Sequence, residues 1–211
     1  MLSTNDLKRE LRGAIASKNR GILATAAERQ AIASVIARVE ALNPTPNPLS
    51  ATNLLAGDWR LLYTTSQELL GIDKFPFVKL GDIYQCVRPA QSRIYNIAEV
   101  PSLPYCDGLV SVVAGFVPAP GDTPGQVSQN RVNVQFNRAV FGLQRALGYR
   151  DVPQYIEKLE AIAKFNLLQG IDFAIDAGRQ QGWLEVTYLD EDLRIGRGNQ
   201  GSLFVLTKDP V

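Results

Sequence analysis

The first fifty residues place apolar side chains at the spacing of two helices. Ser3 with Asp6, and Thr25 with Glu28, pair a hydroxyl residue with an acidic residue three positions later, which is typical of a helix start. The apolar positions that follow are Leu7, Leu11 and Ile15 in the first run, and Ile32, Val35, Ile36, Val39 and Leu42 in the second. We therefore expect a helical hairpin, followed by a proline-rich tether over residues 43–48.

After the tether, the spacing of apolar positions changes toward two, which is the period of a β-strand. Trp59, Leu61 and Tyr63 fall on one face of the first such run. Further alternating runs cover residues 82–87, 93–97, 109–117, 132–137 and 171–175. A short helix is expected to begin near Pro153, because proline suits the first turn of a helix. These signals predict a chain made mostly of short strands.

The chain ends in three short strands over residues 182–207, separated by two polar turns. With the earlier runs, this gives about eight or nine strands and few helices between them, which favours a closed antiparallel barrel over a parallel sheet. We predict a mainly β fold (α+β overall), with the barrel at residues 51–211 and the hairpin and tether at residues 1–50 packed on it. The proline-rich residues 118–125 predict a long loop. A barrel of this size can hold one apolar guest.

The composition narrows the partners and the compartment. The chain has 211 residues, 45% of them hydrophobic and 20% charged, as in an ordinary soluble globule. Its net charge is +1 and no basic stripe is interleaved with aromatics, so nucleic acid is not an expected partner. The N-terminus resembles neither a signal peptide nor a transit peptide, which predicts a cytoplasmic protein. Cys86 and Cys106 are expected to be thiols, and a disulfide between them is the alternative.

Catalytic chemistry finds little support in the sequence. The chain contains no histidine, which removes Ser-His-Asp and Cys-His catalysis and His-ligated zinc. The acidic residues 190–192 could supply metal ligands, but a solvated turn is the better interpretation. Residues 196–201 have the G-x-G-x-x-G spelling of dinucleotide sites, yet a strand follows where a helix is needed, so we interpret them as a hairpin turn. We expect no catalytic residue and no metal.

The most specific combination of residues is Trp59 on the first strand with an arginine on a late strand. An arginine stacked on the tryptophan ring would close one end of the barrel through a cation–π contact. Arg194 and Arg197 are both candidates, because two residues three apart on a bent strand need not share a face. The alternative is an ordinary core tryptophan with unrelated surface arginines.

Three segments of the chain carry a pattern shared with a known family. They are residues 57–66 (GDWRLLYTTS), residues 81–86 (GDIYQC) with Tyr95-Asn96, and residues 188–198 (YLDEDLRIGRG). In these segments, and over about residues 5–208 as a whole, the chain resembles the plastid lipid-associated proteins, also called fibrillins or plastoglobulins, in their cyanobacterial form. The resemblance implies a lipocalin-like barrel whose floor is closed by Gly57, Trp59 and Arg194.

The resemblance also implies a setting for the protein. It implies peripheral association with thylakoid membranes or lipid globules, apolar partners such as carotenoids and prenylquinones, and a role in photoprotection. It further implies a protein partner in isoprenoid or photosynthetic assembly, since one plant branch of the family supports a polyprenyl diphosphate synthase. The first helix is mildly cationic and would suit a membrane surface, but packing on the barrel accounts equally well for its apolar face.

Two hypotheses of different kinds follow. The first is non-catalytic binding or scaffolding of an apolar lipid or isoprenoid, which would be the only bound group. Alternation along the strands suggests the lining residues Trp59, Tyr63, Phe116, Phe136 and Tyr188. The alternative is a protein-interaction module without a ligand, docking on a membrane-associated enzyme or photosynthetic complex through the hairpin or residues 118–125. An enzyme is the weakest hypothesis, because no spacing indicates convergent catalytic groups.

Overall fold

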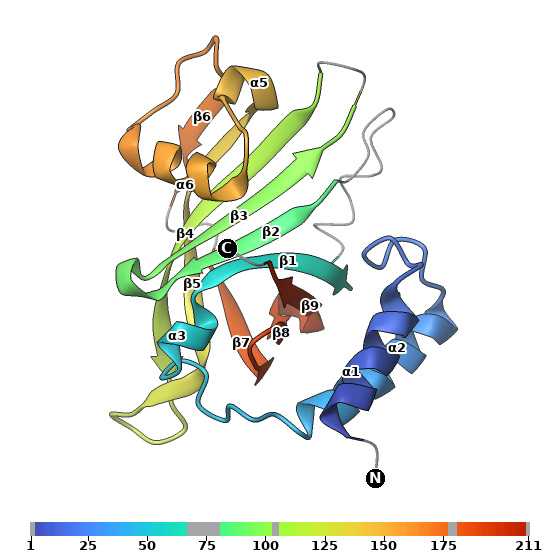
Figure 1. The fold of residues 1–211 in the computed structure, drawn as a ribbon. Helices are drawn as coiled ribbons and strands as arrows, with labels where there is room; N and C mark the ends of the chain where they lie inside the picture. Colours follow the sequence, from blue (N-terminus) through green and yellow to red (C-terminus); the bar gives the residue numbers. More distant parts are fainter. Residues whose placement is uncertain (1–2, 67–80, 103–105, 177–180, 210–211) are drawn as a thin grey trace.

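The computed structural model describes residues 3–66, 81–102, 106–176 and 181–209 (Figure 1). Within these residues, eight antiparallel strands form a closed barrel in the order β1-β2-β3-β4-β5-β7-β8-β9, and β9 pairs with β1 to close it. The strands are β1 (Gly57–Thr64), β2 (Ile83–Arg88), β3 (Arg93–Val100), β4 (Gly108–Pro120), β5 (Val127–Leu143), β6 (Ile171–Ala174), β7 (Gln181–Leu189), β8 (Leu193–Gly198) and β9 (Leu203–Lys208). The mainly β antiparallel barrel predicted from the strand count is confirmed, and so is the lipocalin-like form that the family resemblance implied.

The helices of the described residues lie outside the barrel wall (Figure 1). They are α1 (Thr4–Ile15), α2 (Ala26–Glu40), α3 (Thr52–Leu55), α5 (Gln144–Leu147) and α6 (Val152–Ala161), with 3-10 turns η2 (Pro89–Gln91) and η3 (Asn199–Gly201). Both predicted capping boxes are present, at Ser3 with Asp6 and at Thr25 with Glu28. The one-turn helices α3 and α5 were not expected, because four residues are too few to show a helical period.

Strands β4 and β5 run longer than the sequence pattern indicates. Pro118 and Pro120 belong to β4, so the loop predicted over residues 118–125 is wrong, and only residues 121–126 separate the two strands. The prolines are tolerated because the register of β4 and β5 shifts between Pro118 and Pro120, where a ladder hydrogen bond is not needed. Strand β5 pairs with β7 through its first half and with β6 through its second half. Strand β6 therefore extends the sheet outside the closed barrel.

Buried side chains form three cores, each using a different face of the wall. The barrel interior holds Trp59, Leu61, Val134 and their neighbours. A second core lies between the hairpin and the outer face of β1, β7, β8 and β9, and contains Leu7, Leu11, Ile36, Tyr63, Tyr188 and Ile195. A third lies under α5 and α6, on the outer face of β2 to β5. The apolar face of the hairpin is thus covered by the barrel; the division into units 1–50 and 51–211 stays a prediction.

Ion pairs add to the contact between the hairpin and the barrel. Lys8 lies 2.8 Å from Asp190 and also contacts Asp192, and Arg12 lies 3.0 Å from Asp192. The Asp190 carboxylate further accepts hydrogen bonds from the backbone of its own turn, at Asp192 and Leu193. The acidic turn expected to be merely solvated therefore fastens helix α1 to the β7–β8 turn.

Candidate functional site

Trp59 and Arg194, the two residues expected at the floor of the barrel, contact each other in its interior. Both side chains are almost completely buried, and the Arg194 guanidinium carbon lies 5.0 Å from the centre of the Trp59 ring. Trp59 Nε1 donates to the Leu55 carbonyl over 3.0 Å, and Lys208 Nζ lies 5.1 Å from the same ring. The ring thus receives two cations, as the negative face of an aromatic system favours. Arg194, and not Arg197, is the arginine that meets the tryptophan.

Gly57 permits this closure because its backbone has a φ of +137°, a conformation that other residues rarely adopt. A Cβ at this position would lie 2.5 Å from Cε of Lys208. Glycine therefore lets Lys208 pass the start of β1, where its Nζ donates to the Leu54 carbonyl over 2.9 Å. The role of Gly57 at the barrel floor stays a prediction, and these contacts give a steric reason for it.

Arg197 points away from the interior and holds the hairpin. Its Nη2 lies 2.7 Å from Oε2 of Glu40, and its Nε donates to Oε1 of the same carboxylate over 3.1 Å. Such a two-point contact fixes geometry as well as charge. Arg197 is therefore part of the contact between α2 and β8, on the far side of the wall from Trp59.

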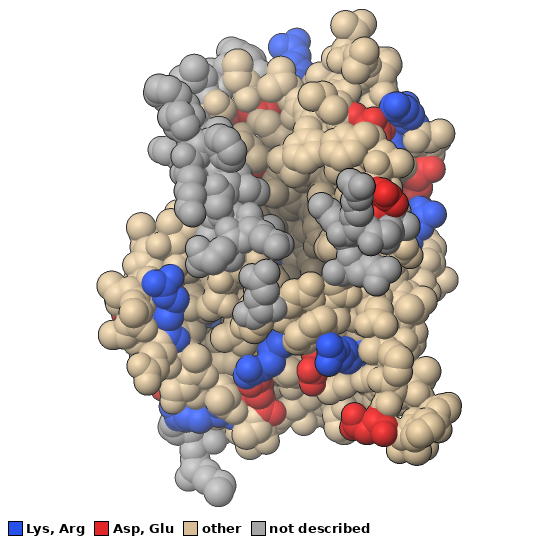
Figure 2. Space-filling model, turned by 180° about the vertical axis from the view of Figure 1, so that it is seen from behind, with Lys and Arg blue, Asp and Glu red and all other residues tan. Residues whose placement is uncertain are grey.

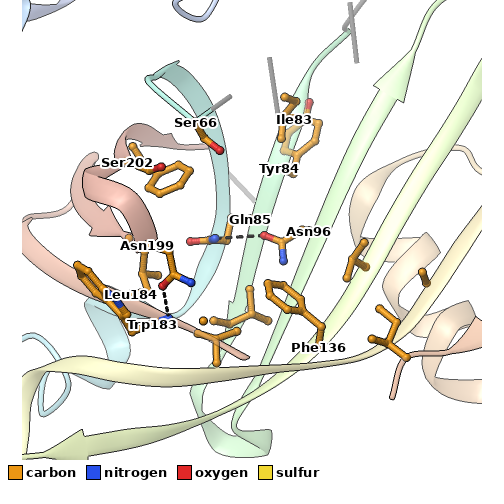
Figure 3. A pocket seen from close by; sticks show the side chains of 18 of the residues that line it. Ser66, Ile83, Tyr84, Gln85, Asn96, Phe136, Trp183, Leu184, Asn199 and Ser202 are labelled. Atoms are coloured by element: carbon orange, nitrogen blue, oxygen red, sulfur yellow. Dashed lines mark hydrogen bonds between the residues drawn. The ribbon is translucent and has the colours of Figure 1, made fainter. Parts of the chain in front are cut away.

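A cavity of about 660 Å³ fills the barrel above this floor. Its volume lies within the range of about 300–1,000 Å³ that is usual for sites of small molecules. The walls come from almost every strand, and their apolar members include Leu61, Ile83, Ile94, Val112, Val134, Phe136, Phe141, Phe173, Trp183, Leu184, Phe204 and Leu206 (Figure 3). Figure 2 shows the back of the molecule hollowed near its centre, with mostly uncharged described residues above the hollow. The interior can accommodate one apolar molecule.

A few polar side chains interrupt the apolar walls. Arg194 Nη2 donates to Gln85 Oε1 over 2.5 Å. Gln85 Nε2 in turn donates to Asn96 Oδ1 over 3.1 Å (Figure 3). At another point of the wall, Asn199 Oδ1 accepts the backbone N–H of Trp183 over 2.9 Å. Burial lowers the pKa of Arg194 to about 9, so its guanidinium stays charged at neutral pH. The buried, charged Arg194 is thus hydrogen-bonded to Gln85, and Gln85 to Asn96, and both amides line the cavity.

The five residues suggested as ligand contacts lie on different sides of the barrel wall. Phe136 lines the cavity, and Trp59 lies in the floor but not in the cavity wall. Phe116 packs on the interior core without lining the cavity. Tyr63 and Tyr188 lie on the outer side, in the core beneath the hairpin, and are therefore not contacts of a molecule inside the barrel.

The two tyrosines face outward because the strands that carry them are bulged. The register of β1 against β9 shifts between Leu61 and Tyr63, and that of β7 against β8 shifts between Val186 and Tyr188. A bulge inserts one residue and reverses the side to which the following side chain points. Alternation counted from Leu61 or Val186 consequently places the tyrosines on the wrong face.

Gln85 and Asn96 were missed by the sequence reasoning, although a signal for them exists. Gln85 stands between Ile83 and Val87, and Asn96 between Ile94 and Ala98, so each is a polar residue at an inward position of an otherwise apolar face. Polar side chains at such positions are costly unless they are hydrogen-bonded. Two of them on neighbouring strands could have indicated a specific interior site.

The remaining candidate groups are the acidic and cysteine side chains. No cluster of three or more acidic, cysteine or histidine side chains able to hold a metal occurs among them. Cys86 is buried and Cys106 exposed, and both are free thiols. Burial raises the pKa of the Cys86 thiol, which makes it a poor nucleophile. In the part of the chain that is described, no helix combines the length and apolar character needed to cross a bilayer.

Comparison with known proteins places the chain among relatives of similar sequence. The PAP_fibrillin family model matches residues 5–207. Probable plastid-lipid-associated protein 2 of Arabidopsis thaliana is 30% identical, with 98% of this chain and 71% of that protein covered. Plastoglobulin-1 of Pisum sativum is 32% identical (96% and 61% covered), and the chromoplast-specific carotenoid-associated protein of Cucumis sativus is 30% identical (96% and 67% covered). No solved structure gave a significant match.

The family match extends from helix α1 to strand β9 and therefore includes the hairpin, the floor residues and the cavity wall. The relatives named for plastid lipids and carotenoids align over nearly the whole chain. The chain therefore belongs to the PAP_fibrillin family, the plastid lipid-associated proteins.

Proposed function

We propose that this protein binds one apolar lipid or isoprenoid molecule inside its barrel, without catalysis. The observation that carries the proposal is the cavity of about 660 Å³ with its mainly apolar walls, closed at the floor by Trp59 and Arg194. The printed names of the relatives, which refer to plastid lipids and carotenoids, support the same chemistry. An apolar molecule entering such walls gains the free energy of leaving water.

The binding experiment uses a lipid and pigment extract of photosynthetic membranes. The purified protein is mixed with the extract, repurified, and analysed by mass spectrometry for apolar molecules held in a fixed ratio. Ala139 is buried and lines the cavity, so Ala139→Phe should fill part of it and reduce the retained amount severalfold. Ala90→Phe makes the same change on the exposed turn η2 and should retain as much as the wild type. Absence of any retained apolar molecule in the wild type would overturn the proposal.

We further propose that the edge of the barrel around β6 contacts a lipid surface. Leu167 and Leu168 are 90% and 93% exposed on the turn before β6, and Ile171 and Phe173 on β6 are 62% and 44% exposed. Phe141 and Phe173 stack with their ring centres 5.9 Å apart, and both also line the cavity. Apolar side chains are thus exposed on the turn and on β6, and one of them, Phe173, also lines the cavity.

Flotation with phosphatidylcholine vesicles tests this surface. Replacing Leu167 and Leu168 together by serine should reduce the floated fraction severalfold, because these side chains would no longer enter the bilayer. Leu23 is 63% exposed in the turn of the hairpin, which lies apart from β6 in Figure 1. Leu23→Ser is therefore the matched control and should float like the wild type. Equal flotation of the double variant and the wild type would refute the proposed surface.

The alternative of a protein-interaction module has less support at the hairpin. The apolar positions Leu7, Leu11 and Ile15 of α1 pack on the barrel, so this face is not available to another protein. Lys8 of α1 pairs with Asp190 of the β7–β8 turn, and Arg197 of β8 pairs with Glu40 of α2. These ion pairs help to hold both helices on the barrel. A partner would have to use other surfaces.

A further inference from the structure

The buried arginine fixes the direction of the amides at the floor of the cavity. A guanidinium group can only donate hydrogen bonds, so Gln85 must turn its oxygen toward Nη2 of Arg194. The NH₂ group of Gln85 then faces Asn96 and donates to its Oδ1. Asn96 in turn directs its own NH₂ group away from Gln85 and into the cavity, as Figure 3 shows.

The NH₂ group of Asn96 donates no hydrogen bond to another described residue. Among the described residues, the hydrogen bond from Gln85 is the contact made by the Asn96 amide, and it uses the oxygen. The neighbouring wall is formed by the apolar side chains of Ile94, Val112 and Phe136, which offer no acceptor. Because Asn96 is only partly buried and lines the cavity, this donor is open to an acceptor on a molecule bound there.

We propose that the cavity selects apolar molecules that carry a neutral hydrogen-bond acceptor, such as a ketone carbonyl, and binds them with that oxygen at Asn96. The inference rests on the proposed function and adds the class of the ligand and the direction in which it lies. A donor-only group would find no free acceptor at this point, because Asn96 Oδ1 is already bonded. An anion is not favoured, since Gln85 stands between the Arg194 charge and the cavity and Asp176 also lines the wall.

Three probes of equal chain length test the selection: tridecan-2-one, tridecan-2-ol and tridecane, each competing with a fluorescent apolar reporter. In the wild type, the ketone and the alcohol should bind at least about fivefold more tightly than the alkane, as one additional hydrogen bond in the cavity predicts. Equal affinity of the ketone and the alkane would overturn this inference and leave the proposed function standing. Failure of all three to displace a bound reporter would also overturn this inference, whereas failure of the reporter itself to bind would count against the proposed function.

Gln85→Glu should reverse the direction of the hydrogen bond between residue 85 and Asn96. A carboxylate only accepts, so it would bind Arg194 and also receive the NH₂ of Asn96, which then turns its oxygen to the cavity. The ketone should lose its advantage over the alkane, while the alcohol, which can donate, should keep its own. A variant that retained the ketone preference would contradict the proposal. Gln91→Glu makes the same change on the exposed turn η2 and should behave like the wild type.

Asn96→Leu supplies an independent variant that introduces no charge. It removes the amide while leaving an apolar side chain of similar size, so the alkane should bind as it does to the wild type and both oxygenated probes should lose about fivefold. Thermal unfolding of each variant shows whether it is folded at the assay temperature. Retention of the ketone advantage in folded Asn96→Leu would equally overturn the assignment.

Discussion

At the scale of single residues, Arg194 connects the stability of the barrel with the chemistry of its interior. The side chain stacks on Trp59 and donates to Gln85, and it has no carboxylate partner among the described residues. A desolvated cation–π contact contributes about 2 kcal/mol, whereas burial of an ion costs several kcal/mol. The contacts of the arginine thus offset much of the cost of its burial, and its removal leaves the Gln85 oxygen without its donor.

Replacement of Arg194 by methionine should destabilise the protein by about 1–3 kcal/mol, because the Gln85 oxygen loses its donor and Trp59 loses its cation. Chemical denaturation measures the free energy of unfolding. Arg197→Met is the matched control on the outer face, where the loss of a half-exposed pair with Glu40 should cost less than about 1 kcal/mol. If Arg194→Met were as stable as the wild type, the cost of burying the charge would equal the gain from its contacts.

Gly57 and Gly13 offer a contrast between two glycines. Gly57→Ala should cost about 1–3 kcal/mol, because its φ is +137° and the new Cβ would meet Lys208. Gly13→Ala lies inside helix α1 with no atom within 4 Å of the new Cβ, so it should stabilise by up to about 1 kcal/mol. Thermal denaturation of the two variants distinguishes them. A stabilising Gly57→Ala would show that the closure of the floor does not depend on this backbone conformation.

At the scale of elements, the hairpin and the barrel are joined by an apolar core with a set of charges at its edge. Leu7 and Leu11 of α1 pack on the outer face of the wall, and Lys8, between them in sequence, reaches Asp190. Burial tends to raise the pKa of Asp190, but hydrogen bonds from Lys8 and Tyr188 outweigh it and hold the pKa at about 2. The carboxylate form is thus the one that the folded protein stabilises.

The contact should therefore weaken in acid. Because the folded pKa of Asp190 lies below the ordinary value of 3.8, its contribution is complete above about pH 5 and is lost as the pH falls toward about 2. Lys8→Met should cost about 1–2 kcal/mol at neutral pH and much less near pH 2, as measured by urea denaturation across this range. Arg9→Met removes the exposed pair with Asp6 and should have a smaller effect. A cost of Lys8→Met that did not change with pH would contradict the assignment.

At the scale of the whole molecule, the same strands serve more than one core. Strands β1, β7, β8 and β9 face the cavity on one side and the hairpin on the other, while β2 to β5 face the cavity and helices α5 and α6. Loss of one core therefore removes the support for a wall that another core needs. We expect the hairpin and the barrel to unfold together.

Leu11→Ala tests this cooperativity. Leu11 is fully buried beneath the hairpin, so its truncation should cost about 2–5 kcal/mol. Both tryptophans, Trp59 and Trp183, lie in the barrel, so fluorescence reports the barrel while far-ultraviolet circular dichroism also reports the helices. The two transitions should coincide and move together in Leu11→Ala. Loss of helical signal before the change in fluorescence would instead show that residues 1–50 unfold as a separate unit. Leu23→Ala, at an exposed position, should leave both transitions within about 0.5 kcal/mol.

Much of the fold can be predicted from local signals. The capping residues of α1 and α2, the proline that begins α6 and the alternation in most strands all act within a few residues of the chain. The inward Phe136 also follows from alternation. Tyr63 and Tyr188 could not be placed in this way, because a bulge in each strand depends on how the neighbouring strand is paired.

The sequence by itself determined most of the elements and the barrel class, since these depend on periodicity, capping and residue type. It also suggested that Trp59 meets one of two arginines, with an ordinary core tryptophan as the alternative. Only the tertiary structure decided that Arg194 lies inside and Arg197 outside, because alternation along β8 places residues three apart on opposite faces without saying which face is the inner one. It also brought Gln85 of β2 and Asn96 of β3 next to Arg194 of β8. That proximity depends on closure of the barrel, which joins strands more than a hundred residues apart in the chain and which no local pattern encodes.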